Sequence, residues 1–125
     1  MKWQPIESAP RNKQILIRYQ KGKGRRQRPD GEWVVTQAKA IPLIKYVKMG
    51  FDFGTGEIKE QCIYYVTDGY EYFLNNGFQM EPCECVKWYD HLDRLICDTS
   101  AKKIVNLVEW WMELPEEPVI HPKNG

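Results

Sequence analysis

The chain has 125 residues, of which 42% are hydrophobic and 13% aromatic, so it can bury the core of one domain. Eighteen basic residues against seventeen acidic ones give a net charge of +1. This balance argues against a dedicated binder of duplex nucleic acid, because such domains are usually strongly basic. We therefore expect a single domain over residues 1–125, with an extended, proline-rich tail over residues 115–125.

The sequence shows no sign of export or membrane insertion. Residues 1–5, MKWQP, lack the apolar run of a signal peptide. No stretch approaches the ~20 apolar residues that a membrane-spanning helix needs. We expect a cytoplasmic protein that makes no membrane contact and whose four cysteines are reduced thiols.

The first half predicts two β-hairpins. Residues 14–19 and 32–40 are rich in β-formers and are joined by the basic loop 21–31, KGKGRRQRPDG. Residues 43–48 and 58–67 predict a second pair of strands around a glycine-rich turn region at 49–57. Residues 3–12 contain two prolines and predict an irregular, extended lead-in.

The second half predicts one short helix and further strands. Residues 70–75, YEYFLN, predict a helix that Asn76-Gly77 closes. Residues 78–82 predict irregular chain, residues 83–89 predict a strand, and residues 90–97 are ambiguous. Residues 100–114 fit either a capped helix or a strand. The fold class is therefore α+β, a mainly antiparallel β-sheet of four to six strands with one or two short helices.

The two ends and one middle segment carry a resemblance. Residues 3–10, WQPIESAP, followed by the strand ILI at 15–17, resemble a WxPIExAP…ILV opening. Residues 111–118, WMELPEEP, resemble an HWMPLPEPP ending, and residues 31–33, GEW, resemble a Gly-Trp strand. Together they resemble a small family of phage and prophage proteins of unknown function. The resemblance implies a phage setting in a bacterial cytoplasm.

No catalytic motif stands out among the nucleophiles and bases. The serine–histidine candidates Ser8, Ser100, His91 and His121 have no strand–GxSxG–helix context. Asp90, His91 and Asp93 predict a solvated turn rather than an acid–base pair. We expect a protein that is not an enzyme.

Metal and cofactor sites are not predicted either. Cys83-Glu84-Cys85 lacks the CxxC knuckle of most zinc sites, so core packing is the better interpretation of these thiols. The glycines of the basic loop fit neither a P-loop nor a dinucleotide fingerprint. We expect no metal and no cofactor.

Two features suit a nucleotide ligand. The basic loop sets arginines beside glycines, and a guanidinium offers a planar fork of donors to phosphate. The aromatic side chains are too many for one small core, and exposed rings stack on bases. The candidate ligand contacts are Lys23, Arg25, Arg26 and Arg28 for phosphate and Tyr70, Tyr72 and Trp88 for a base.

The main functional hypothesis is a non-enzymatic phage-type binding protein. It would act as an anti-defence sponge that sequesters a nucleotide second messenger, a cyclic nucleotide or a cyclic ADP-ribose isomer, as a homo-oligomer with sites between subunits. The alternative is a protein–protein inhibitor of a bacterial defence complex, similar to an anti-CRISPR protein. The sequence does not decide between a small ligand and a protein partner.

Overall fold

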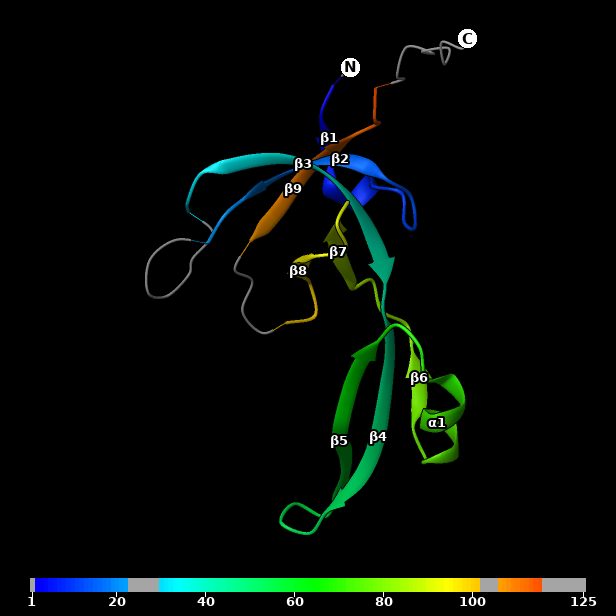
Figure 1. Ribbon diagram of the computed structural model, residues 1–125. Helices are drawn as coiled ribbons and strands as arrows, with labels where there is room; N and C mark the ends of the chain where they lie inside the picture. Colours follow the sequence, from blue (N-terminus) through cyan, green and yellow to red (C-terminus); the bar gives the residue numbers. More distant parts are fainter. Residues whose placement is uncertain (1, 23–29, 102–105, 116–125) are drawn as a thin grey trace.

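The computed structural model describes residues 2–22, 30–101 and 106–115. Figure 1 shows that this part of the chain forms two separate sheets, a curled one above and a smaller one that projects below. The upper, six-stranded sheet is called the body. The lower, three-stranded sheet and its helix, residues 43–82, are called the arm.

The body is an antiparallel sheet with the strand order β1-β9-β2-β3-β7-β8. Its strands are β1 (Gln4–Pro5), β2 (Ile15–Gln20), β3 (Trp33–Pro42), β7 (Val86–Asp90), β8 (Leu95–Asp98) and β9 (Leu107–Met112). Buried residues alternate with less buried ones at Ile15 and Ile17 of β2, at Ala38 and Ala40 of β3 and along β7, as expected for a sheet that packs on one face. The main core is Ile15, Ile17, Ala38, Ala40, Val86, Trp88, Cys97, Val108 and Trp111.

The first residues are fixed to the last strand. A short 3₁₀ helix, η1 (Ile6–Ser8), follows β1. The indole Nε1 of Trp111 donates to Ser8 Oγ at 3.0 Å, and Ser8 Oγ donates to the carbonyl of Pro5 at 2.8 Å. The predicted irregular lead-in is therefore wrong over residues 4–8, because the buried indole N–H requires an acceptor that η1 supplies.

The arm is a three-stranded antiparallel sheet with one helix on it. The strand order is β5-β4-β6, with β4 (Ile44–Asp52) between β5 (Glu57–Val66) and β6 (Gln79–Glu81). Helix α1 (Tyr70–Asn75) packs on the sheet through Phe73, whose ring stacks on Tyr46 with centroids 4.4 Å apart. Beyond the helix, Gly77 has a φ of 82°, and the Phe78 N–H donates to the Phe73 carbonyl at 3.0 Å. This is the left-handed closure that the sequence predicted.

The arm leaves the body between two neighbouring strands. Pro42, the last residue of β3, lies opposite Val86, the first residue of β7. One residue further on, the Leu43 N–H donates to the Cys85 carbonyl at 2.9 Å, and the Cys83 thiol lies 3.5 Å from the Leu43 carbonyl. We call residues 42–43 and 82–86 the neck.

Much of the predicted secondary structure is confirmed. The fold is mainly antiparallel β-sheet, both hairpins are present as β2–β3 and β4–β5, and α1 has the predicted bounds. The α+β class fits only loosely, because α1 has six residues and η1 three. In the described ranges, no helix is long and apolar enough to cross a membrane.

Several predictions differ from the structure. The strands form two sheets rather than one. Residues 79–81 pair with β4 as β6, and the strand predicted over 83–89 begins only at Val86, because Cys83 and Cys85 lie in the neck. The ambiguous residues 90–97 form a turn and most of β8. Of the two alternatives for residues 100–114, the strand is correct for the described residues 107–112.

The stacked Tyr46 contains a polar atom without a partner. Its side chain is fully buried, and its hydroxyl makes no hydrogen bond in the described part of the chain. A buried hydroxyl without a partner costs free energy of folding because it has left water uncompensated. The ring of Tyr46 stabilises the fold by packing, whereas its unpaired hydroxyl destabilises the fold.

We expect Tyr46→Phe to raise the free energy of unfolding by about 1 kcal/mol in urea denaturation, since it removes only the unpaired hydroxyl. Tyr64→Phe is the matched control, because Tyr64 also packs on Phe73 but is 49% exposed. Its effect should be close to zero. A loss of about 1 kcal/mol in Tyr46→Phe would mean that the hydroxyl is hydrogen-bonded after all.

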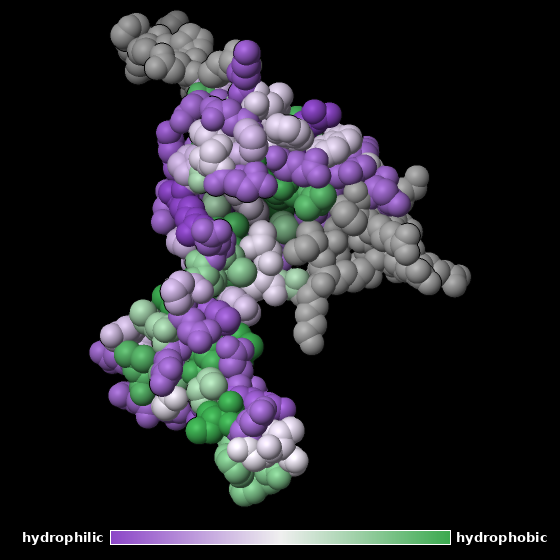
Figure 2. Space-filling model, turned by 180° about the vertical axis from the view of Figure 1, so that it is seen from behind, coloured by the Kyte–Doolittle hydropathy of each residue, from purple (hydrophilic) through white to green (hydrophobic). Residues whose placement is uncertain are grey.

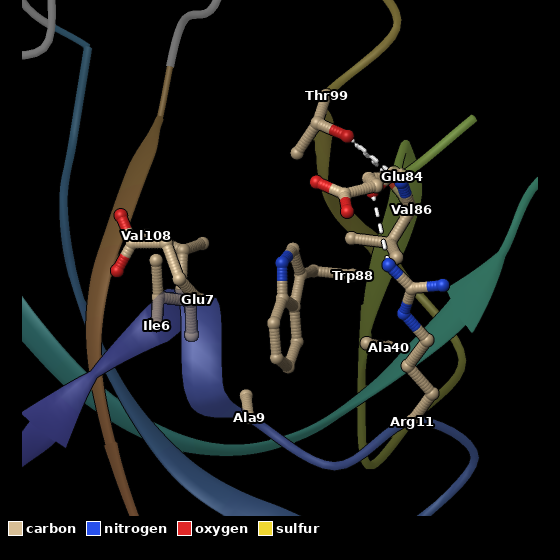
Figure 3. A pocket seen from close by; sticks show the side chains of 10 residues that line it. All are labelled: Ile6, Glu7, Ala9, Arg11, Ala40, Glu84, Val86, Trp88, Thr99 and Val108. Atoms are coloured by element: carbon tan, nitrogen blue, oxygen red, sulfur yellow. Dashed lines mark hydrogen bonds between the residues drawn. The ribbon is translucent and has the colours of Figure 1, made fainter.

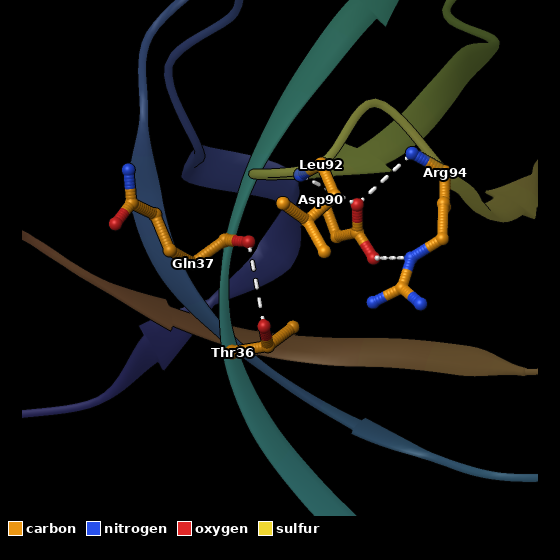
Figure 4. Close-up of polar contacts among 5 residues, drawn as sticks. All are labelled: Thr36, Gln37, Asp90, Leu92 and Arg94. Atoms are coloured by element: carbon orange, nitrogen blue, oxygen red, sulfur yellow. Dashed lines mark hydrogen bonds and ion pairs between the residues drawn. The ribbon is translucent and has the colours of Figure 1, made fainter.

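One carboxylate organises the turn between β7 and β8. Figure 4 shows Asp90 facing Leu92 and Arg94. Asp90 Oδ1 accepts the N–H groups of Leu92 and Arg94, both at 2.9 Å, and Oδ2 accepts Arg94 Nε at 2.9 Å. These donors, the Arg94 backbone first, hold the pKa of Asp90 below its usual value.

Because the folded state holds the Asp90 pKa below its unfolded value, the carboxylate stabilises the fold above about pH 4 and loses this effect as the pH falls further. Asp90→Asn should lower the denaturation midpoint at pH 7. The difference between its midpoint and that of the native chain should shrink as the pH is lowered. Asp68→Asn, at an exposed loop position, is the control. An equal deficit at pH 7 and pH 3 would contradict a charge effect.

Candidate functional site

Helix α1 lies on one face of the arm's sheet, and residues 43–82 contain no second helix for the other face. Successive residues of a strand point to opposite faces, so Val47, Met49 and Phe51 point away from Tyr46 and its covering helix. Ile63 lies opposite Val47, and Ile58 lies opposite Phe51. We call the surface formed by Val47, Met49, Phe51, Ile58 and Ile63 the open face.

The open face is largely apolar, although Glu60, which lies opposite Met49, points to it as well. Phe51 is 52% exposed and Ile58 69% exposed, while Met49 and Ile63 are each more than two fifths exposed. Of these five side chains only Val47, at the end of the surface nearest the neck, is buried. Seen from behind in Figure 2, hydrophobic side chains lie among hydrophilic ones over the arm and reach its tip. A cluster of large exposed apolar side chains is typical of a surface that binds another molecule.

Hydrogen bonds around Asp52 build the turn at the tip of the arm, where the open face ends. Asp52 Oδ1 accepts the Gly54 N–H at 2.8 Å, and the Gly56 N–H donates to the Asp52 carbonyl at 2.8 Å. Phe53, 91% exposed, contacts Phe51 edge to face with centroids 4.9 Å apart. The turn is therefore built by polar bonds but ends in an aromatic side chain that faces solvent.

The arm is acidic as well as apolar. Residues 43–82 contain three lysines against six acidic residues. Two of the lysines form ion pairs within the arm, Lys45 with Glu81 and Lys59 with Asp52, each at 3.1 Å. The bond from Lys59 lowers the pKa of Asp52, so that carboxylate is charged at neutral pH. The remaining carboxylates give the arm a negative field.

The covered face of the arm has a groove beside α1. It has a volume of about 350 Å³ and is lined by Lys48, Tyr64, Tyr72, Phe73, Asn76 and Phe78. The Lys48 ammonium lies 5.7 Å from the centre of the Phe78 ring. The groove therefore combines aromatic walls with one cation.

A second pocket lies inside the curl of the body. Figure 3 shows the Trp88 indole in its middle, with the Arg11 guanidinium on one side and Ile6, Glu7 and Val108 on the other. The volume is about 270 Å³, below the roughly 300–1,000 Å³ of most ligand sites. Arg11 Nη2 donates to the Glu84 carbonyl at 3.2 Å. This pocket is small for a nucleotide.

The structure separates the predicted ligand contacts. Lys23, Arg25, Arg26 and Arg28 lie outside the described residues. Tyr70 and Tyr72 are exposed on α1, and Tyr72 lines the groove, whereas Trp88 is 3% exposed in the core of the body. Tyr72 lies on the helix of the arm and Trp88 in a strand of the body, so they do not form one stacking site within a chain.

Two of the thiols, Cys83 and Cys85, are neighbours in the neck. No three His, Cys, Asp or Glu side chains of residues 2–22, 30–101 and 106–115 are grouped to hold a metal. Burial raises the pKa of the Cys97 thiol to about 11, so it is protonated at neutral pH. Burial, and then the neighbouring Cys83, raise the pKa of Cys85. Neither thiol is prepared to act as a nucleophile.

Sequence analysis missed the residues of the open face. Residues 49–57 looked like a turn because three glycines fall within them, yet β4 continues through Gly50 to Asp52. Gly50 is needed where the Gln61 side chain crosses β4, since a Cβ there would meet the Gln61 amide. The signal that was available is the alternation of Val47, Met49 and Phe51, which extends the strand to the tip.

Comparison with protein-family models, with curated proteins and with solved structures finds no match to this chain.

Proposed function

We propose that this is a non-catalytic protein-binding protein whose arm docks through its open face on a partner with an apolar and basic surface. The observation that carries the proposal is the open face itself, a row of exposed Met, Phe and Ile side chains on a projecting sheet. Aromatic residues and Met are enriched at protein interfaces. Large apolar side chains gain free energy when a partner removes them from water.

The charge of the arm specifies the partner further. Lys45 and Lys59 are already paired within the arm, so Glu57, Glu60, Asp68 and Glu71 outweigh Lys48. A negative surface beside an apolar one favours a partner that is positive around an apolar centre. Proteins that bind nucleic acid have such basic surfaces. An inhibitor of a bacterial defence complex, expected from the sequence as the alternative, is a partner-binding role of this class and stays a prediction.

The proposal is tested by capture from a bacterial lysate followed by binding with purified components. Met49→Ser/Phe51→Ser/Ile63→Thr should weaken binding of the captured protein by at least about tenfold, because it removes apolar contact area. The affinity of the native chain should also fall as salt rises from 50 to about 300 mM, since the charges attract across the interface.

The matched control is Leu92→Ser/Leu95→Ser, which removes two similarly exposed apolar side chains from the body. It should bind like the native chain. If the arm variant and the control bind the purified partner equally well, the open face is not the docking surface. Capture alone, without this difference between the variants, does not support the proposal.

A second candidate function rests on the groove beside α1. Tyr72, predicted from the sequence to stack on a base, lines this groove together with Tyr64 and Lys48. Two phenol rings and an ammonium are suited to a base and a phosphate. This arrangement favours the nucleotide-sequestering role, with Lys48 as a cation that sequence analysis did not select.

The nucleotide role predicts a thermal shift. A nucleotide at 100 times its dissociation constant adds about 2.7 kcal/mol, which is several degrees for a domain of this size. Cyclic and linear nucleotides and cyclic ADP-ribose isomers should be screened with the native chain and with Lys48→Ala/Tyr72→Ala, with Tyr70→Ala as the control on the same helix. A shift that the groove variant retains would place the site elsewhere, and no shift with any nucleotide would end this candidate.

A further inference from the structure

The outer edge of β5 offers a second, independent surface. β5 pairs with β4 on one side, and in the described part of the chain its other side has no strand beside it. Its outward N–H and C=O groups are therefore free along residues 57–66. Such an edge pairs readily with another strand unless its side chains prevent it.

The charges at the tip end of this edge are self-complementary. Glu57, Ile58 and Lys59 follow one another, so a two-fold axis at Ile58 brings two antiparallel copies of β5 together with Ile58 opposite Ile58. Glu57 of each copy then lies opposite Lys59 of the other, whose ammonium also lies 3.1 Å from Asp52 Oδ2 of its own chain. Both side chains point to the covered face, because Asp52 and Gly50 are their partners on β4. Opposite charges at directly opposed positions stabilise a sheet.

Neighbouring registers bring like charges together. A two-fold axis at Lys59 sets Lys59 opposite Lys59, and an axis at Glu60 sets Glu60 opposite Glu60. Gln61 has no partner on β4 and is the extra residue of a bulge, which interrupts regular pairing beyond Glu60. At the tip side of this bulge, the register centred on Ile58 is the favoured one.

This register also buries apolar surface. On the open face, Ile58 stands beside Phe51, and both are more than half exposed in the single chain. Across the two-fold axis the row becomes Phe51, Ile58, Ile58 and Phe51, from both copies. Residues 57–59 of the two copies pair in this register, so the two arms meet at their tips with their open faces on the same side.

We infer that two copies of this chain associate through the tip-side edges of β5, centred on Ile58, and thereby join their open faces into one surface. The edge of β5 is distinct from the open face, so this inference goes beyond the proposed function. A chain that dimerises need not bind the partner, and a monomer can still bind it.

The inference is tested by exchanging the charges at positions 57 and 59. Dimerisation of each variant is measured by sedimentation velocity over a range of protein concentrations. Glu57→Lys and Lys59→Glu should each weaken the dimer by about tenfold, because each sets like charges opposite each other at two places. Glu57→Lys/Lys59→Glu restores opposite charges and should return the dimerisation constant to within about threefold of the native value. Glu60→Lys, which changes the net charge as much as Glu57→Lys, is the control and should leave the dimer intact.

The register is tested by a disulfide. In a Cys62→Ser background, Ile58→Cys should form an intermolecular disulfide under mild oxidation, because facing residues at the two-fold axis lie within disulfide distance. Ile63→Cys should not. A monomer at every concentration, a charge-exchanged double variant that stays as weak as the single variants, or a disulfide at 63 instead of 58 would each overturn the inference.

Discussion

The neck is the constraint on which the arrangement of this molecule depends. β3 and β7 are neighbours in the body, yet the chain leaves β3 at Pro42 and returns at Val86 only after building the whole arm. The bond from the Leu43 N–H to the Cys85 carbonyl extends the pairing of β3 and β7 by one step into the neck. Beyond it the two segments pair again, as β4 and β6 of a new sheet, with Lys45 opposite Glu81. The arm therefore projects from the body instead of adding strands to it.

The arm's small size explains why it carries the candidate site. A three-stranded sheet needs cover on a face to be stable, and here one helix of six residues supplies it through the contact of Phe73 with Tyr46. The chain provides no second layer for the opposite face in its described residues, so Met49, Phe51, Ile58 and Ile63 stay in water. A core residue of a larger domain would be buried by its own chain. These four are exposed instead.

Local sequence signals, such as those at turns and helix ends, predicted most of the elements. They did not predict which strands pair with each other over long sequence separations. Helix α1 is bounded by Gly69 and Gly77, both with positive φ, and this end signal is visible in the sequence. Whether β4 joins the body or starts a new sheet depends on contacts between distant residues, such as Leu43 with Cys85. The candidate site was the part least predictable from the sequence, because the sequence does not show which apolar face of a sheet remains exposed. Trp88 is conspicuous in the sequence but buried, whereas Ile58 is inconspicuous but exposed.

The position of the neck gives the arm a role in folding. For the body, residues 43–85 are the loop of a β3–β7 hairpin, and closing a long flexible loop costs conformational entropy before any strand pairs. The arm has its own local hairpin β4–β5, with a short turn and a low sequence separation, so it can form early. Once β6 joins β4, Pro42 and Val86 are already near each other, and the long loop behaves like a short turn. The same segment that carries the proposed docking surface thus shortens the search by which the two middle strands of the body find each other.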